Sequence, residues 1–98
     1  MVIVGGTFEM APHQREEFIA SRHAMMRASR AETGCLDYTF CADPIEPGRV
    51  ILFERWESQS DLDAHLSGMR AGPPSGEDIV PQSVSVVFYD ATAQAPRG

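Results

Sequence analysis

Apolar and polar side chains alternate along residues 2–10, at the start of the chain. Val2, Val4 and Phe8 fall on one side of an extended backbone, and Ile3 falls on the other. A period of two residues is typical of a strand that has one face packed against a core. We therefore predict a first strand over residues 2–10.

The pattern changes to a helical period over residues 12–31. Pro12 suits the first turn of a helix, where its missing N–H is not needed, and Glu16 and Glu17 complement the positive end of the helix dipole. A largely apolar stripe recurs at helical spacing, which predicts that one face of this helix packs on a sheet. The stripe consists of Phe18, Ile19, Arg22, Met25, Met26 and Ser29.

Two extended segments follow, separated by a stretch that is dense in turn formers. Gly34 closes the helix, and alternate positions of residues 35–41 then share one face of a second strand. Those positions are Leu36, Tyr38 and Phe40. The sequence DPIEPG at residues 43–48 predicts a hairpin with a long loop, which leads into a third strand over residues 50–57.

A second helix and a last strand complete the pattern. Ser58 or Ser60 is placed to cap the helix, which ends where residues 72–78 begin. Residues 72–78 contain too much proline and glycine for regular structure and predict a mobile loop. Residues 83–92 alternate as a final strand, and residues 94–98 are expected to form a frayed, flexible tail. The helix presents Leu62, His65, Leu66 and Met69 at helical spacing.

The predicted order of elements is β-α-β-β-α-β. This is the split βαβ, ferredoxin-like arrangement of the α+β class, in which a four-stranded antiparallel sheet carries two helices on one face. The other face would expose a larger apolar patch than soluble monomers usually tolerate, so we predict a homodimer through the open sheet face. The residues expected on that face are Ile3, Ile51, Phe53, Val87 and Tyr89.

Length and charge narrow the classes of function. A chain of 98 residues suits one domain, which we place at residues 1–93. The formal net charge of −6 and the pI of about 4.8 argue against a nucleic-acid partner, which would need clustered basic residues. Residues 1–6 carry no charged leader, and no apolar run is long enough to span a membrane. We therefore expect a cytoplasmic protein that binds neither nucleic acid nor membranes.

The two cysteines predict no redox or metal chemistry. Cys35 and Cys41 fall in one predicted strand, which would hold their Cα atoms roughly 20 Å apart at about 3.3 Å per residue. A disulfide cannot bridge that distance. Because the chain has no CxxC pair and no histidine at ligand spacing from either thiol, we interpret both cysteines as small buried hydrophobic residues.

Three segments resemble the antibiotic-biosynthesis-monooxygenase family. They are ETGCLDYTF at residues 32–40, the turn with Asp-Pro and Pro-Gly at residues 43–48, and FERWESQSDLDAH at residues 53–65. The likeness spans nearly the whole chain and implies a dimeric α/β barrel. The best-known members oxidise polycyclic aromatic phenols to quinones with O₂, without metal or flavin. Others degrade haem, isomerise signalling sugars or have no known activity, because one fold hosts several reactions.

The resemblance also implies a site in the cleft between the sheet and the helices. By motif, Trp56 at the end of the third strand and His65 on the second helix would line this cleft, and Tyr38 would join them. Haem-degrading relatives carry an Asn on the first strand, where this chain has Gly6. Because His65 still offers an imidazole to iron, haem degradation stays a minor alternative.

Cofactor-free oxidation needs a base for a phenolic proton, an aromatic pocket and the exclusion of water. His65 is the natural catalytic base by its pKa. Trp56 and Tyr38 offer a flat wall with two hydrogen-bonding groups, and Arg22 is placed to stabilise a phenolate oxygen. Glu54 is in register with Trp56, so it would face the helices and pair with Arg22. Apart from His65, the other four residues would bind a small aromatic substrate. The reaction would need no metal and no cofactor.

Each assignment has a structural alternative. His65 can be a buried histidine that is hydrogen-bonded to a carboxylate or a carbonyl and does no chemistry. Trp56 can be a core anchor, and Glu54 can belong to a structural ion pair. For His13 and His23 we expect only contact with solvent.

Two functional hypotheses follow from these observations. The first is a cofactor-independent monooxygenase that acts on a phenolic or quinol-like compound, with residues 72–78 as a lid over the pocket. The second is a non-catalytic, dimeric ligand-binding or stress-associated protein on the same fold. They differ in whether His65 is needed for turnover.

Overall fold

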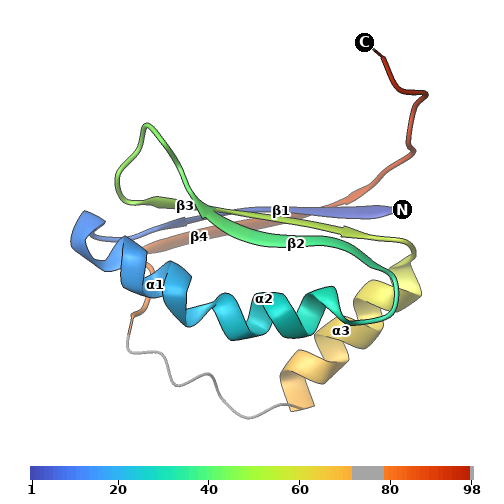
Figure 1. Cartoon of the computed structure of the whole chain (residues 1–98), viewed down its shortest axis with the longest axis horizontal. Coiled ribbons are helices and arrows are strands. Elements are labelled where there is room, and N and C mark those ends of the chain that lie inside the picture. The colour runs from blue at the N-terminus through green and yellow to red at the C-terminus, as the bar shows by residue number, and fades with distance from the viewer. Residues whose placement is uncertain (72–78, 98) are drawn as a thin grey trace.

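The computed structural model describes residues 1–71 and 79–97. Its strands form one open antiparallel sheet in the order β2-β3-β1-β4, with the helices on one face (Figure 1). The predicted ferredoxin-like α+β fold is confirmed. The elements in chain order are β1 (Val2–Glu9), the 3-10 turn η1 (Pro12–Gln14), α1 (Arg15–Ser21), α2 (His23–Arg30), β2 (Cys35–Ala42), β3 (Arg49–Trp56), α3 (Gln59–Ala71) and β4 (Ser83–Asp90).

The core lies between the helices and the inner face of the sheet. Val2 and Val4 alternate into it from the central strand β1, and Leu52 joins them from β3. Phe18 of α1 is fully buried against this layer. Burying one such side chain stabilises the fold by about 1.5–3 kcal/mol relative to leaving it in water. The alternation seen in the sequence therefore gives the correct inner face of the sheet.

The first helix is interrupted, unlike the single helix predicted over residues 12–31. A 3-10 turn begins it, and α1 and α2 then follow one another across β2 (Figure 1). Arg22 separates them, and its N–H donates to the carbonyl of Ile19, three residues back, at 3.0 Å. A bond of this spacing tightens the turn locally, which ends α1 and starts α2.

The second strand contains an irregularity that the alternation did not predict. Its pairing with β3 shifts between Cys35 and Asp37, so Leu36 is an extra residue in a bulge. Leu36 is therefore exposed, and the expectation that it shares the buried face of Tyr38 is wrong. Cys41 is also exposed, against the prediction of a buried thiol, while Cys35 is half-buried; neither cysteine is in a disulfide.

The start of α3 is held by a cap and by a glycine. The Ser58 hydroxyl accepts a hydrogen bond from the N–H of Asp61 at 3.2 Å and donates one to its carboxylate at 2.8 Å. Gly34, at the entrance to β2, has a φ of 79°, and a Cβ at this position would overlap the carboxylate of Asp61. Glycine is therefore required where β2 passes the first turn of α3. This close approach brings His65, two turns into α3, next to the residues before β2.

The outer face of the sheet carries the apolar patch that the sequence predicted. Phe53, Val87 and Tyr89 are 42%, 43% and 52% exposed. The inner side of β4 is also open in the described part of the chain, with Val84 and Phe88 53% and 52% exposed, because α1 and α2 pack mainly on β2. None of the helices within residues 1–71 and 79–97 is long and apolar enough to cross a membrane.

Candidate active site

A mostly apolar cavity of about 240 Å³ lies between the inner face of the sheet and the helices. Apolar side chains such as Leu52, Phe40 and Leu66 form most of its wall. Four polar or charged side chains also line it: Arg22, Tyr38, Glu54 and His65. Few polar groups converging in an apolar hollow are the usual composition of a small-molecule site. The fold thus brings together four of the five residues proposed from the sequence. These four come from β2, β3, α3 and the junction between α1 and α2.

His65 reaches the cavity from the buried side of α3. Its side chain is 2% exposed, and its Nδ1 lies 2.9 Å from Oε2 of Glu32. The imidazole ring also contacts two aromatic rings, with centroid distances of 4.7 Å to Trp56 and 5.4 Å to Tyr38. These three neighbours restrict the ring to one orientation.

Glu54 enters the same cavity from β3 and is only 6% exposed. Its carboxylate accepts a hydrogen bond from the indole Nε1–H of Trp56 at 2.9 Å. Burial raises the pKa of Glu54 above its ordinary value, and the indole hydrogen bond and the nearby His65 offset only part of this effect. The predicted partner of Glu54 was Arg22. Both line the cavity, and their ion pair stays a prediction.

Tyr38 contributes an aromatic side chain to the lining of the cavity. Its side chain is buried in β2, and its hydroxyl donates a hydrogen bond to the sulfur of Met25 at 3.2 Å. Burial, with the nearby charge of Glu54, raises the pKa of Tyr38 above its ordinary value. The phenol therefore stays protonated at neutral pH, so Tyr38 contributes a neutral side chain to the lining of the cavity.

Arg22 brings a positive charge to the cavity wall at the break between α1 and α2. Its guanidinium carbon lies 4.6 Å from the ring centroid of Phe18 and 5.8 Å from that of Phe40. Stacking over aromatic faces is favourable for a guanidinium and fixes its plane. The guanidinium is therefore held against these two rings, and Arg22 is one of the residues that line the cavity.

Trp56 does not line the cavity, although we expected it to line the cleft between sheet and helices. It is fully buried and lies outside the lining of the cavity, behind His65 and Glu54. From there it contacts the imidazole and donates its indole N–H to the carboxylate. Its contacts support two residues of the site, and it also anchors the core, as the structural alternative for Trp56 proposed.

Glu32 is a neighbour of His65 that the sequence pattern did not predict. It belongs to the ETGCLDYTF segment, but it lies 33 residues from His65 in the chain and outside any helix or strand. Helical or strand periodicity cannot relate two such positions. The sequence offered only the general expectation that a buried histidine has a carboxylate or carbonyl partner, and this does not identify Glu32.

Gly6 is the residue that we compared, by resemblance, with the first-strand Asn of haem-degrading relatives. It is buried on the inner face of β1, and a Cβ built there would lie 3.3 Å from Leu52 Cβ and 3.4 Å from Val86 Cγ2. These contacts are tighter than usual, so the neighbours would have to shift for any larger side chain. The inner face therefore offers no amide at this position.

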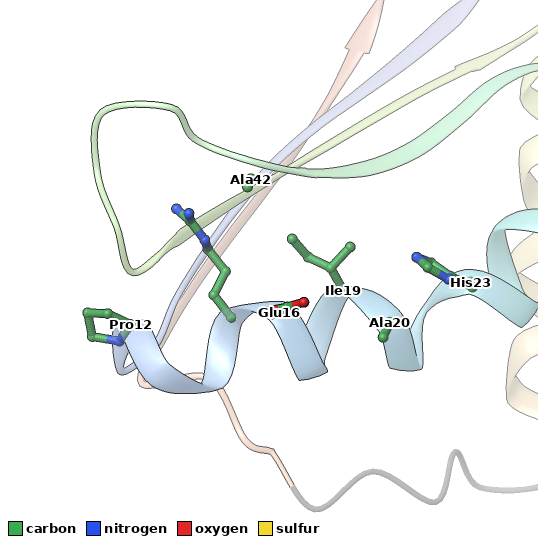
Figure 2. A pocket seen from close by; sticks show the side chains of 7 residues that line it. Pro12, Glu16, Ile19, Ala20, His23 and Ala42 are labelled. Carbon is green, nitrogen blue, oxygen red and sulfur yellow. The ribbon is translucent and has the colours of Figure 1, made fainter.

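A second hollow of about 480 Å³ lies between α1 and the end of β2, and Figure 2 shows the side chains that line it. It is larger, but none of the proposed site residues lines it. Its Arg15 donates hydrogen bonds of 2.9 Å to the carbonyls of Asp43 and Glu46 and so holds the loop between β2 and β3. We interpret this hollow as a consequence of loop packing.

The remaining expectations concern the other histidines and the lid. His13 and His23 are exposed, as predicted. The predicted lid of residues 72–78 lies outside the described residues. The cavity is therefore defined by the sheet, the helices and the junction between α1 and α2.

Comparison with known proteins identifies the family. The family model described as antibiotic biosynthesis monooxygenase matches residues 1–70. An uncharacterized protein of Synechocystis sp. is 36% identical over 65 residues, which are 66% of this chain and 44% of that protein, so this chain spans less than half the length of that relative. A crystal structure from Deinococcus radiodurans, of a protein named for the same family, superposes with a TM-score of 0.78 at 21% identity and covers 100% of this chain and 99% of that one.

A further structural relative has a named ligand. The haem degrader MhuD of Mycobacterium tuberculosis, solved with two haems in its active site, superposes with a TM-score of 0.74 at 16% identity, covering 98% of this chain and 100% of that one. At such identities these two structures demonstrate a common fold. Because the family model covers well over half of the 98 residues, the chain belongs to the antibiotic biosynthesis monooxygenase family.

Proposed function

We propose that this protein is a cofactor-independent monooxygenase that oxidises a small phenolic or quinol-like aromatic compound with O₂. The observation that carries the proposal is a mostly apolar cavity that is lined by both the oriented imidazole of His65 and the guanidinium of Arg22. Membership of the family supports the class of reaction. The reaction itself and its substrate are our inference from these residues.

The residues suit a sequence of proton transfers around an anionic intermediate. His65 would take the proton of the substrate hydroxyl, and Arg22 would stabilise the phenolate. A ring carbon of this anion would add O₂ to form a peroxide. His65 would return its proton, and loss of water would leave one oxygen atom in a new carbonyl and the other in water. The apolar side chains of the wall would shield the intermediate from water on the sides that they cover.

The size of the cavity favours a compact substrate. Its volume of about 240 Å³ is below the roughly 300–1,000 Å³ of typical ligand pockets. One or two fused aromatic rings suit this space better than a haem, and the crowding around Gly6 also disfavours the haem-type site. Haem degradation is therefore the second candidate, supported by the fold of MhuD and by the imidazole of His65.

The test is oxygen uptake by metal-free protein with a panel of hydroquinones, naphthols and anthrone-like phenols. We expect uptake by the wild type and its loss, by about 10²-fold or more, in His65→Ala, because a positioned general base contributes that much. His23→Ala changes an exposed histidine and is the matched control. Equal rates in wild type and His65→Ala would contradict the assignment of the base.

Two further outcomes separate the alternatives. If no compound is consumed although an aromatic ligand binds the folded protein, a non-catalytic ligand-binding role replaces the proposal. Haem titration with a Soret band that is lost in His65→Ala, followed by oxygen-dependent bleaching, would favour haem degradation.

We also propose that two copies of the chain associate through the outer face of the sheet. Phe53, Val87 and Tyr89 form an apolar surface there, and a second copy brings a surface of the same chemistry. A domain of this size gains stability from such extra burial.

A further inference from the structure

We propose that Glu32 is the positioning residue that sets the tautomer of His65, an inference that rests on the proposed function. Glu32 lies in the turn between α2 and β2, and the backbone of this turn is fixed on both sides. The N–H of Glu32 donates to the carbonyl of Ser29 at 3.0 Å, and its carbonyl accepts from the N–H of Cys35 at 3.2 Å. The carboxylate is therefore presented to α3 from a defined point of the chain.

The carboxylate and the imidazole meet at hydrogen-bond distance. Oε2 of Glu32 lies 2.9 Å from Nδ1 of His65, across 33 residues of sequence. The ring has little freedom to turn away, because it is in contact with the rings of Trp56 and Tyr38 and only 2% of the side chain is exposed. Nδ1 therefore keeps its hydrogen bond with Glu32.

This contact determines which nitrogen is basic. A carboxylate only accepts hydrogen bonds, so the proton of the neutral imidazole must reside on Nδ1. The lone pair is then on Nε2, and the ring that carries it lines the cavity. In the proposed step the O–H bond of the substrate breaks and an N–H bond forms at Nε2. The Nδ1–H bond is kept, and the charge of Glu32 stabilises the imidazolium.

Glu32 is better suited to this role than the other carboxylate of the site. Glu54 already accepts the indole hydrogen bond of Trp56 and is almost fully buried. The side chain of Glu32 is 39% exposed, so water offsets the cost of its charge while it faces a buried ring. Among the residues that the structure describes, the other ionisable groups that line the cavity with His65 are Tyr38 on β2, Glu54 on β3 and Arg22.

The test reads the tautomer directly and does not depend on turnover. Imidazole nitrogen shifts of the full, ¹⁵N-labelled chain would be recorded at a pH where the ring is neutral, with the signals of His65 identified by their loss in His65→Ala. We expect the proton on Nδ1 in the wild type and a shift of the population toward Nε2–H in Glu32→Gln. Glu46→Gln, which neutralises an exposed glutamate of the loop between β2 and β3, should leave the spectrum unchanged.

A proton on Nε2 in the wild type would overturn the inference, even if Glu32→Gln did not fold. So would an unchanged tautomer in a folded Glu32→Gln. In the oxygen assay we expect Glu32→Gln to lower kcat by about 10²-fold with little change in KM, because binding is not disturbed. An unchanged kcat in an active enzyme would also overturn it. The expected tautomer without turnover on any compound would refute the proposed function and leave the positioning role of Glu32 intact.

Discussion

Glu54 places a carboxyl group in a cavity whose wall is mostly apolar. Burial raises its pKa in the folded protein above the ordinary value of 4.5. As the pH rises, the unfolded chain therefore loses this proton before the folded chain does. The stability that Glu54 contributes is complete below the ordinary pKa and is lost as the pH rises through the folded pKa. Above the ordinary pKa, Glu54 thus lowers the stability of the fold relative to acidic pH.

We predict that Glu54→Gln is more stable than the wild type at about pH 7 and that the difference disappears toward about pH 4, because the variant removes the buried charge. Glutamine still offers an oxygen to the indole N–H of Trp56. Urea unfolding at several pH values would measure the difference in the free energy of unfolding. Glu57→Gln, one residue beyond β3 and exposed, is the control for loss of a charge. A wild type that is the more stable protein at neutral pH would contradict this account of Glu54.

At the scale of elements, α3 determines where the proposed base lies. The helix begins at the Ser58 cap, and His65 lies on its buried side together with Leu62. Ser58→Ala removes the acceptor for the N–H of Asp61 and should lower the free energy of unfolding by about 1 kcal/mol. For a domain of this size that is about 4–8 °C in Tm. Ser67→Ala, on the exposed surface of the same helix, should have little effect.

Calorimetry of the two serine variants would measure this difference. Equal Tm values for Ser58→Ala and Ser67→Ala would contradict the role of the cap. Because the cap holds α3 next to Gly34, we also expect Ser58→Ala to broaden the imidazole signal of His65. That result would connect the start of the helix to the geometry of the site.

At the scale of the whole molecule, the proposed dimer depends on the outer face of the sheet. Val87 lies on this face and Val84 on the inner side of β4, and both are exposed in one chain, at 43% and 53%. We predict that Val87→Glu converts the proposed dimer to a monomer, because like charges would be buried at a symmetric interface. Val84→Glu adds the same charge to the same strand and should keep the dimer.

Sedimentation at micromolar concentration, with circular dichroism for folding, would distinguish these variants. A wild type that is already monomeric would refute the dimer. Dissociation by Val84→Glu alone would move the interface to the inner side of β4.

The local pattern of the sequence was sufficient for the architecture. Periods of two and of 3.6 residues identified the strands and helices, with ends displaced by one or two residues, because side-chain direction repeats at those intervals. The same patterning placed Glu54 and His65 on inner faces. The pattern missed the break at Arg22, because one tightened turn leaves the helical spacing almost unchanged. It missed the bulge at Leu36 because the bulge lies at the start of β2, so that the alternation from Asp37 onward is regular.

The contacts of the site were decided by tertiary structure. Sequence alone determined that a histidine, a tyrosine and a carboxyl group face the core, since burial follows from periodicity. It could not determine that His65 meets Glu32 or that Trp56 lies behind the cavity, because these positions depend on how α3 approaches the turn before β2. That approach is determined by packing between segments that are far apart in the chain. The sequence marked Gly34 as the end of a helix and Ser58 as a candidate cap, but only the folded protein shows that Gly34 leaves room for Asp61, in the turn that the Ser58 cap holds.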